Sequence, residues 1–510
     1  MGYFKKGVTG VTLLFMLSIF ANLVSYFTRA VLTRTISLEE YGLFYAAYSG
    51  MMLLLIFSNM GYGSAVVKFI PEFIVKKKYG MVKYILIFTT GIRLGIAFLF
   101  SLILITLARP LTDHYFKTPL AYPVVIFFAL TIIFMTAQQH LTRIFNSLHM
   151  FFSMGVIEVF QKTGFLFCIL ISLFFSISLS PAHISLYFLV ATAVGVIVFL
   201  PLVFTRSKFF RTKTSFEPGF RSVLSRFAVS SFLIGVGYLI IGYIDTLMLT
   251  SLRGLQEVAI YNVVLPTVML LAFFGDSVSS IFFPMVAELW AQKKNASLMQ
   301  SYHFLQRYSL FFITPFVLLL LLFPKLIINL LFGAAYVQGY LAMMILSLGI
   351  VFLSVSTIRQ TVLMGVGHPH TVTWIVFVGT FVNIALNLIL IPVWGINGAA
   401  IATTLSYASI MVLLSVQLKK KIGLMASLLD WVKLAISSIG FIAAVYLVKS
   451  LLVMNQFVEA ALCLTAASMV YLGIALALKL VSFKELWSFY EAIRSNTASK
   501  FGYSKEHSEE

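Results

Sequence analysis

Long apolar spans with few charges recur along the whole chain, and they restrict what it can fold into. Each is about 20 residues long or more, the length that an α-helix needs to cross the hydrocarbon core of a bilayer. The spans are 7–32, 41–67, 84–108, 121–142, 154–179, 185–205, 223–250, 258–287, 306–332, 339–363, 371–391, 398–418, 431–452 and 457–480. A backbone in hydrocarbon must satisfy its own hydrogen bonds, so each span is expected to be helical. The sequence therefore predicts an all-α polytopic membrane protein with about 14 transmembrane helices.

The composition excludes an ordinary soluble globule. Charged residues make up 10% of the 510-residue chain and hydrophobic residues 60%, whereas a soluble domain carries roughly 25% charged residues. The first span is longer than a signal-peptide core and no small-residue cleavage site follows it, so we expect it to be retained. Cys168 and Cys463 both lie inside spans, which argues against a disulfide scaffold.

The formal net charge of +19 does not indicate a nucleic-acid partner, because the basic residues gather on one side of the predicted membrane. Most of the 36 lysines and arginines lie in loops on the side of the N-terminus, including 68–83, 206–226 and 419–421. Lysine and arginine are enriched in cytoplasmic loops. We therefore predict a multi-pass protein of the cytoplasmic (plasma or inner) membrane with both termini in the cytoplasm.

A shift of 216 positions keeps the apolar spans in phase and aligns several rare polar residues, which indicates an internal duplication. The aligned pairs are Tyr45 with Tyr261, Glu72 with Glu288, Lys77 with Lys293, Arg143 with Arg359, and Arg29 with Asp245. The predicted organisation is an N-terminal six-helix half (1–205), a cytoplasmic linker (206–222), a second six-helix half (223–418), helices 13 and 14 (419–480) and a cytoplasmic tail (481–510). Substrate sites of transporters with such repeats lie between the halves.

Segments of the second half carry a resemblance to a known family. Gly365-Val-Gly-His-Pro, together with the segment from Asn383 to Thr403, looks like the eleventh and twelfth helices of the MOP transporter superfamily. Asp245-Thr-Leu-Met-Leu-Thr with Ala259-Ile-Tyr261 resembles the connection between the seventh and eighth helices. The chain as a whole is most similar to the Wzx-type polysaccharide flippases. The resemblance implies alternating access between two halves related by an axis along the membrane normal. It also implies a groove for a lipid tail formed by helices 13 and 14.

Basic residues at membrane depth suggest an anionic substrate, because a guanidinium pairs with two phosphate oxygens and stays charged. The candidates for substrate binding are Asn22, Arg29, Arg93, Lys162 and Arg359. Asn22 and Arg29 belong to a polar line with Ser18 and Ser25 that shares one helix face. Other interpretations stay open: Lys162 has the spacing of an ion pair with Glu158, while Arg93 and Arg359 could extend toward lipid headgroups.

Three acidic residues lie well inside spans, and we assign them to a gate or to ion coupling: Glu158, Asp245 and Asp276. An ionised group in hydrocarbon needs a partner or a watery cavity. We hypothesise that an ion pair between Arg29 and Asp245 closes the outer side; the alternative is that each is paired within its own half. A proton or a sodium ion bound at one of the carboxylates could drive transport.

The expected function is that of a flippase that moves a polyprenyl-diphosphate-linked oligosaccharide across the cytoplasmic membrane for cell-surface glycan biosynthesis. Its expected partners are this lipid, membrane lipids and other glycan-assembly proteins. We find no catalytic or metal-binding constellation among the eight histidines, and expect no cofactor and no enzymatic activity. The alternatives are an ion-coupled multidrug exporter of the MATE type, a flippase for the peptidoglycan precursor lipid II, and, less favoured, a membrane glycan polymerase or ligase.

Overall fold

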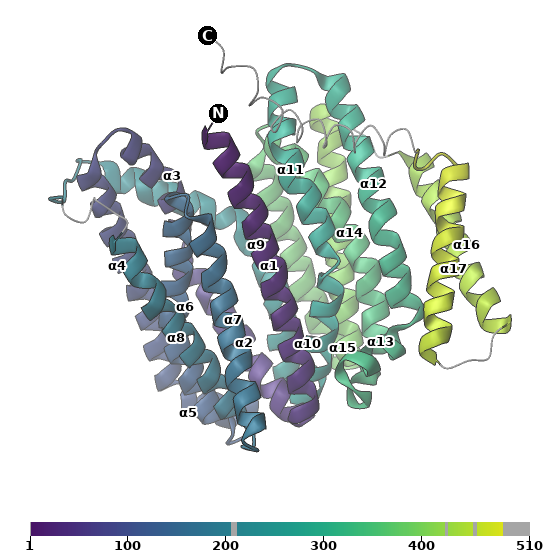
Figure 1. The fold of residues 1–510 in the computed structure, drawn as a ribbon, viewed down its shortest axis with the longest axis horizontal. Coiled ribbons are helices and arrows are strands. Elements are labelled where there is room, and N and C mark those ends of the chain that lie inside the picture. Colours follow the sequence, from purple (N-terminus) through teal and green to yellow (C-terminus); the bar gives the residue numbers. More distant parts are fainter. Residues whose placement is uncertain (1, 206–211, 424–426, 452–455, 483–510) are drawn as a thin grey trace, which may run out of the picture. The chain divides into compact units, whose positions relative to one another are not determined.

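The computed structural model describes residues 2–205, 212–423, 427–451 and 456–482. These residues form α-helices with short 3₁₀ and π segments and no strand (Figure 1), which confirms the predicted all-α class. The predicted tail lies almost entirely outside the described residues, as does the first part of the predicted linker, 206–211.

Helices of membrane-spanning length recur along the described chain. The elements of the first 270 residues are α1 (Gly2–Thr35), α2 (Leu38–Asn59), α3 (Tyr62–Val75), α4 (Tyr79–Thr106), α5 (Ala108–Pro110), η1 (Leu111–Phe116), α6 (Ala121–Ser147), α7 (Phe151–Phe174), α8 (Pro181–Thr205), α9 (Phe220–Leu252) and α10 (Leu255–Met269). Those that follow are α11 (Ala272–Ala291), α12 (Asn295–Leu322), α13 (Pro324–Phe332), η3 (Ala334–Gly339), α14 (Tyr340–Gly365), α15 (Pro369–Ile422), α16 (Leu428–Leu451) and α17 (Gln456–Ala477).

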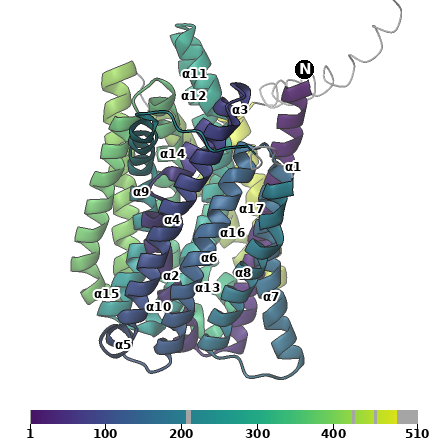
Figure 2. The same ribbon diagram turned by 90° about the vertical axis from the view of Figure 1, so that its left-hand side faces the viewer.

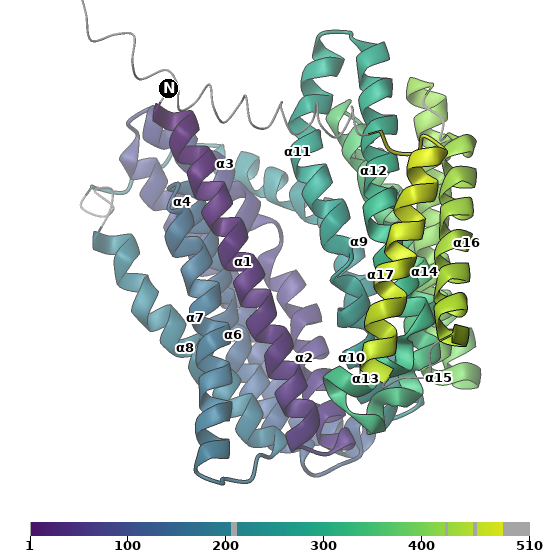
Figure 3. The ribbon, with the colours of Figure 1, turned by 45° about the vertical axis from the view of Figure 1, so that its right-hand side comes forward.

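The described chain forms two compact units. The first comprises residues up to 267 together with 325–346 and 369–406, and the second comprises 268–324, 347–368 and residues from 407 onward. In the first unit α4, α6, α7 and α8 run side by side, with α1 packed on α7 (Figure 2). In the second unit α16 and α17 pack on each other and on α12 (Figure 3). The unit boundaries differ from those of the predicted halves, 1–205 and 223–418, and the groove expected from α16 and α17 stays a prediction.

Twelve described helices are long and apolar enough to cross a membrane, or 13 if the bent pair Phe220–Leu233 and Val236–Leu252 is one span. The predicted number of 14 is therefore not confirmed. One reason is α15, whose 54 residues are counted as one helix but cover two of the predicted spans, 371–391 and 398–418.

The α15 helix turns back on itself at Gly395. This glycine has φ 53° and ψ −129°, a conformation that residues with a Cβ atom rarely adopt. Asn383 and Thr403 lie on either side of the bend, and the Asn383 amide donates a 3.1 Å hydrogen bond to the Thr403 hydroxyl. Twenty residues of a straight helix would hold these groups about 30 Å apart. The two arms of α15 therefore run beside each other where they meet the site described below.

The turn before α2 begins with a capping box. The Ser37 hydroxyl accepts from the Glu40 backbone N–H, while the Glu40 carboxylate accepts from the Ser37 backbone N–H, which satisfies two otherwise unpaired donors of the first helical turn. Gly42 follows in the next turn, and a Cβ atom there would lie 1.9 Å from the Leu255 carbonyl oxygen. The glycine thus lets the backbones of α2 and α10 come into contact.

The turns before α4 and α12 have the same backbone conformation. Both helices are 28 residues long, and their first residues, Tyr79 and Asn295, are 216 positions apart. The preceding Lys78 and Lys294 have φ/ψ of −89°/65° and −87°/63°, and the residues before them have φ of 56° and 57°. This recurrence supports the duplication predicted from the sequence.

Candidate functional site

A cavity of about 90 Å³ lies in the first unit among α1, α2, α6, α7 and α8. Its lining combines two cations with an aromatic wall: Ser25, Thr28, Arg29, Phe44, Tyr45, Tyr48, Met135, Gln161, Lys162, Phe165 and Phe188. Ser25 and Arg29 are four residues apart on α1, so they share a helix face. The predicted polar line thus reaches a cavity in its last turn.

Arg29 is held by uncharged groups. Its guanidinium donates a 2.9 Å hydrogen bond to the Asn262 carbonyl oxygen and lies 4.2 Å from the centre of the Tyr45 ring, a cation–π geometry. Among the described residues no carboxylate lies within ion-pair distance of Arg29. The positive charge is therefore oriented by the protein but not neutralised by it.

The aromatic wall is built from rings in mutual contact. The Phe44 ring stacks on Phe165 with centroids 6.1 Å apart, and Phe188 packs edge-on against Phe165 at 5.3 Å. Tyr45 continues the wall toward Tyr41 at 4.6 Å. Such aromatic faces suit the apolar faces of sugar rings as well as each other.

Lys162 forms the ion pair that its spacing on α7 predicts. Its ammonium lies 2.8 Å from Glu158 and donates a 3.1 Å hydrogen bond to the Asn22 side-chain oxygen. Asn22, Glu158 and Lys162 are therefore neighbours, and Lys162 also lines the cavity. Glu158 offsets this charge, which leaves the Arg29 charge as the uncompensated one.

Asp245 is completely buried in a second polar cluster of the first unit. Its carboxylate accepts hydrogen bonds from the Tyr261 hydroxyl at 2.6 Å, the Asn387 amide at 2.6 Å and the Thr403 hydroxyl at 2.5 Å. The donors reach it from α10 and from both arms of α15, so the bend at Gly395 is what assembles the cluster.

The hypothesised ion pair between Arg29 and Asp245 is absent from the described residues of this structure. Each group finds partners nearer to it: Arg29 the Asn262 carbonyl, and Asp245 its three donors. Uncharged side chains on neighbouring helices donate to the Asp245 carboxylate, and a backbone carbonyl accepts from the Arg29 guanidinium. The pair is therefore not formed in this conformation, and its role in closing the outer side stays a prediction, because the pair is expected to break when the cavity opens outward.

Arg93 lies in a third place, buried between α4 and α6 with 1% of its surface exposed. It donates a 2.9 Å hydrogen bond to the His140 Nδ1 atom, and Nε2 of the same ring lies 2.8 Å from the Thr90 hydroxyl. Because arginine can only donate, Nδ1 must accept and Nε2 carries the proton. The side chain points into protein rather than toward lipid headgroups, and it is not among the residues that line the cavity.

The remaining predicted residues belong to the second unit. Arg359 is 3% exposed, and its guanidinium bonds the Tyr302 hydroxyl at 3.3 Å, the Met411 carbonyl at 3.0 Å and the Ser415 hydroxyl. It therefore connects helices within the protein instead of extending to the surface. Asp276 on α11 is exposed. The structure thus groups Asn22, Arg29, Lys162 and Glu158 in one site and separates Asp245, Arg93, Arg359 and Asp276 from it.

Gln161 is the cavity residue that the sequence analysis missed. Its side chain donates to the Thr192 hydroxyl at 2.9 Å and accepts from the Gln138 amide at 3.1 Å. These hydrogen bonds connect α7 to α8 and to α6 at the cavity. A polar side chain in the middle of an apolar span, next to Lys162, was the available signal. The aromatic lining other than Tyr45 gave no such signal, because the chain holds 50 phenylalanines.

Comparison with protein families gives two matches. A model of a family described as polysaccharide biosynthesis protein matches residues 8–290, and the MatE model matches residues 231–389. Together they cover the segments that hold the cavity and the cluster residues Asp245, Tyr261 and Asn387, whereas the bend of α15 at Gly395 lies beyond residue 389.

Similar proteins include an uncharacterized membrane protein of Methanocaldococcus jannaschii, which is 29% identical over 80% of this chain and 83% of its own length. A probable low-salt glycan biosynthesis flippase of Haloferax volcanii is 24% identical over 51% of this chain and 56% of its own length.

Similar solved structures include the lipid II flippase MurJ in an inward closed conformation, with a TM-score of 0.75 and 15% identity over 91% of this chain and 98% of that one. An inward-facing multidrug resistance MATE family transporter of the MOP superfamily has a TM-score of 0.66 and 12% identity over 82% of this chain and 98% of that one. Identities this low show a common fold alone.

Proposed function

Because the chain belongs to the polysaccharide biosynthesis protein family, within the MOP transporter superfamily, we propose that it is a flippase for a polyprenyl-diphosphate-linked oligosaccharide. It transfers this lipid from the cytoplasmic to the outer leaflet of the plasma membrane by alternating access, for the assembly of a cell-surface glycan. The diphosphate and the first sugars enter the cavity of the first unit, while the polyprenyl chain stays in the bilayer. The glycan biosynthesis flippase among its relatives supports this class of substrate.

The observation that carries the proposal is the unneutralised guanidinium of Arg29 in a cavity between membrane-spanning helices. A cation at membrane depth costs several kcal/mol unless a partner or water compensates it. A diphosphate provides that compensation with paired oxygens that match the guanidinium. The Tyr45 ring holds the guanidinium from one side, and the rings of Phe165 and Phe188 provide apolar faces for sugars. A cavity of about 90 Å³ holds only small groups, so the proposed cycle includes its widening.

The test is leaflet transfer in proteoliposomes. A labelled polyprenyl-diphosphate oligosaccharide is reconstituted with the protein, and an impermeant glycosidase reports the sugar that reaches the outer leaflet. Arg29→Ala should lower the rate about ten- to hundred-fold, as expected for the loss of a hydrogen bond between charged groups. Arg109→Ala removes an equal charge from an exposed position outside the cavity and should transfer at the unaltered rate. Equal rates for Arg29→Ala and the unaltered protein would contradict the assigned role of the cavity.

Asp245 is the candidate for ion coupling in the proposed cycle. Its carboxylate is fully buried and receives three donors, and among the described residues it has no cationic partner. A proton or a sodium ion would neutralise it. Transfer driven by an imposed gradient of one of these ions, and insensitive to that gradient in Asp245→Asn, would identify the ion.

An ion-coupled exporter of cationic drugs is the second candidate, and the match of residues 231–389 to the MatE model favours it. The charge of the cavity disfavours it, because the uncompensated Arg29 guanidinium would repel a cation. The same proteoliposomes discriminate between the two functions. Exchange of a cationic dye without transfer of the lipid-linked glycan would replace the flippase by the exporter.

A further inference from the structure

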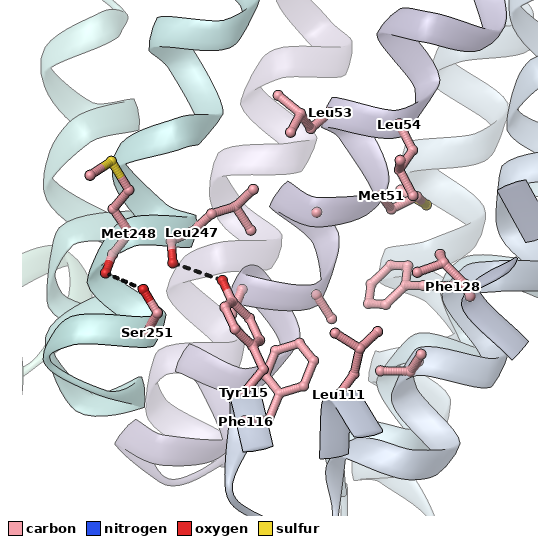
Figure 4. Close-up of a pocket in the computed structure, with 15 residues that line it drawn as sticks. Met51, Leu53, Leu54, Leu111, Tyr115, Phe116, Phe128, Leu247, Met248 and Ser251 are labelled. Carbon is pink, nitrogen blue, oxygen red and sulfur yellow. Dashed lines mark hydrogen bonds between the residues drawn. The ribbon is translucent and has the colours of Figure 1, made fainter. Parts of the chain in front are cut away.

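An apolar pocket of about 380 Å³ opens in the first unit near the ends of α4 and α9 (Figure 4). It is lined almost entirely by aliphatic and aromatic side chains from α2, α4, η1, α6 and α9. Residues 46 to 54 of α2 form one wall, and eight residues of helix extend about 12 Å. The pocket is therefore deep enough for a stretch of hydrocarbon chain to lie along α2.

The η1 turn closes one end of this pocket. Tyr115 points across the opening, and its hydroxyl donates a 2.7 Å hydrogen bond to the Leu247 carbonyl on α9 (Figure 4). Burial raises the pKa of Tyr115 to about 12, so the phenol stays neutral and leaves no charge at the apolar surface. Phe116 packs beside it with 8% of its surface exposed.

A polar pocket of about 370 Å³ adjoins the apolar one and shares Tyr115, Phe116 and Ser251 with it. Its charged lining consists of two cations, Lys117 and Arg253, and one carboxylate, Glu39, which accepts a 2.8 Å hydrogen bond from the Gln256 amide. Arg253 is paired with Glu257 at 2.8 Å, but among the described residues no carboxylate lies within ion-pair distance of the exposed Lys117. An apolar chamber thus continues into a polar chamber that offers one unpaired positive charge.

We propose that these two chambers bind one polyprenyl phosphate, with the isoprenoid chain along α2 and the phosphate at Lys117. The proposal rests on the flippase function above and names a second place where its lipid is held, distinct from the cavity at Arg29. A single apolar chamber suits a lipid with one chain better than a two-chain bilayer lipid. The phosphate pairs with the Lys117 ammonium, which no described carboxylate neutralises.

The headgroup must supply most of the selectivity at this site. Bilayer lipid is as apolar as the chamber, so a hydrocarbon chain gains little by leaving it. A phosphate close to Lys117 gains a charged hydrogen bond that a neutral lipid cannot form. We therefore expect the site to prefer a polyprenyl phosphate to the corresponding alcohol.

A single aromatic layer separates this site from the cavity at Arg29. Phe128 lines the apolar pocket, and its ring lies 5.3 Å from Phe44 and 6.3 Å from Tyr48, both of which line the cavity. A lipid whose headgroup leaves the cavity can thus be held next to it by its chain. The site is placed to receive the lipid after transfer.

The test is photo-labelling of the full-length protein in lipid nanodiscs. The probe is a polyprenyl monophosphate with a diazirine on its isoprenoid chain, and peptide mass spectrometry locates the label. We expect label on residues 46–54 or 111–116. Gly50→Leu, which fills the apolar chamber, and Lys117→Ala, which removes the charge without touching the core, should each reduce it about ten-fold. Arg109→Ala is the matched control with the same change of charge and should keep the label.

Three outcomes would overturn the proposal. The first is label at these residues that is unchanged in both Gly50→Leu and Lys117→Ala, and the second is label confined to other helices. The third is equal displacement of the probe by an anionic two-chain phospholipid, which would make the pocket a general lipid site. Leaflet transfer is measured on the same variants, because transfer that persists with unchanged label refutes this site alone. Absence of transfer by the unaltered protein refutes the flippase function, whatever the label shows.

Discussion

Two charged residues at membrane depth, the fully buried Asp245 and the partly buried Arg29, are held by neutral groups. The Asp245 carboxylate accepts hydrogen bonds from two hydroxyl groups and one amide. The Arg29 guanidinium donates a hydrogen bond to a backbone carbonyl and lies against an aromatic ring. Such partners orient a charge while leaving it available to a ligand of opposite sign. In this respect Arg29 differs from Lys162, whose charge is already offset by Glu158.

Replacing Asp245 by asparagine should destabilise the protein. The substitution keeps the shape but places an NH₂ group against one of the three donors, and a buried unsatisfied donor costs about 1–3 kcal/mol. We expect a lower unfolding temperature in thermal denaturation of the purified protein in detergent. Asp113→Asn, at an exposed position of η1, is the matched control and should unfold with the unaltered protein. Equal unfolding of Asp245→Asn and this control would refute the assigned hydrogen bonds.

At the scale of elements, the bend of α15 does most to build the Asp245 cluster. Glu257 accepts from the Ile396 backbone N–H at 2.9 Å and from Arg253 at 2.8 Å, so its carboxylate caps the arm that starts after Gly395. The bend then brings the Asn383 and Thr403 side chains together. The relative placement of the predicted spans 371–391 and 398–418, and with it the surroundings of Asp245, therefore depends on the turn at Gly395 and on its contact with Glu257.

A side chain at Gly395 should disrupt this bend. In Gly395→Ala the new Cβ atom would lie 2.1 Å from the Glu257 carboxylate, and φ is 53°. A non-glycine residue in such a conformation costs of order 1–3 kcal/mol. We expect a lower unfolding temperature and loss of leaflet transfer together. Gly242→Ala is the control, because a Cβ atom there meets nothing within 4 Å; similar behaviour of the two variants would argue against the assigned strain.

At the scale of the whole molecule, the arrangement of basic loops leads to a prediction about sidedness. The turn at Lys77 lies on the side of the N-terminus in the predicted topology, and Lys117 follows η1 on the opposite side. In a background with both native cysteines, Cys168 and Cys463, replaced by alanine, Lys117→Cys should react with an impermeant thiol reagent added to intact cells. Lys77→Cys should react only after permeabilisation. The opposite pattern would invert the topology assigned by the positive-inside rule.

The division of the chain into its two units was not predictable from the pattern of spans. The sequence shows a repeat at 216 positions, and the matching turns at Lys78 and Lys294 support it. Repeats describe similarity along the chain, whereas packing depends on which helix faces meet. Residues 223–267 fall in the predicted second half but pack in the first unit, with α9 against α2 and α3.

The sequence by itself determined the all-α membrane class and the family, because hydrophobic length and motif are local properties of the chain. Helical spacing marked Arg29 as a candidate residue. Only the tertiary structure decided which partners the buried charges have. Arg29 bonds the backbone carbonyl of Asn262 across 233 positions, and Asp245 bonds the side chains of Asn387 and Thr403 across 142 and 158 positions. A hydrogen bond joins atoms about 3 Å apart. The way the helices pack therefore decides which polar groups lie within that distance of Arg29 and Asp245.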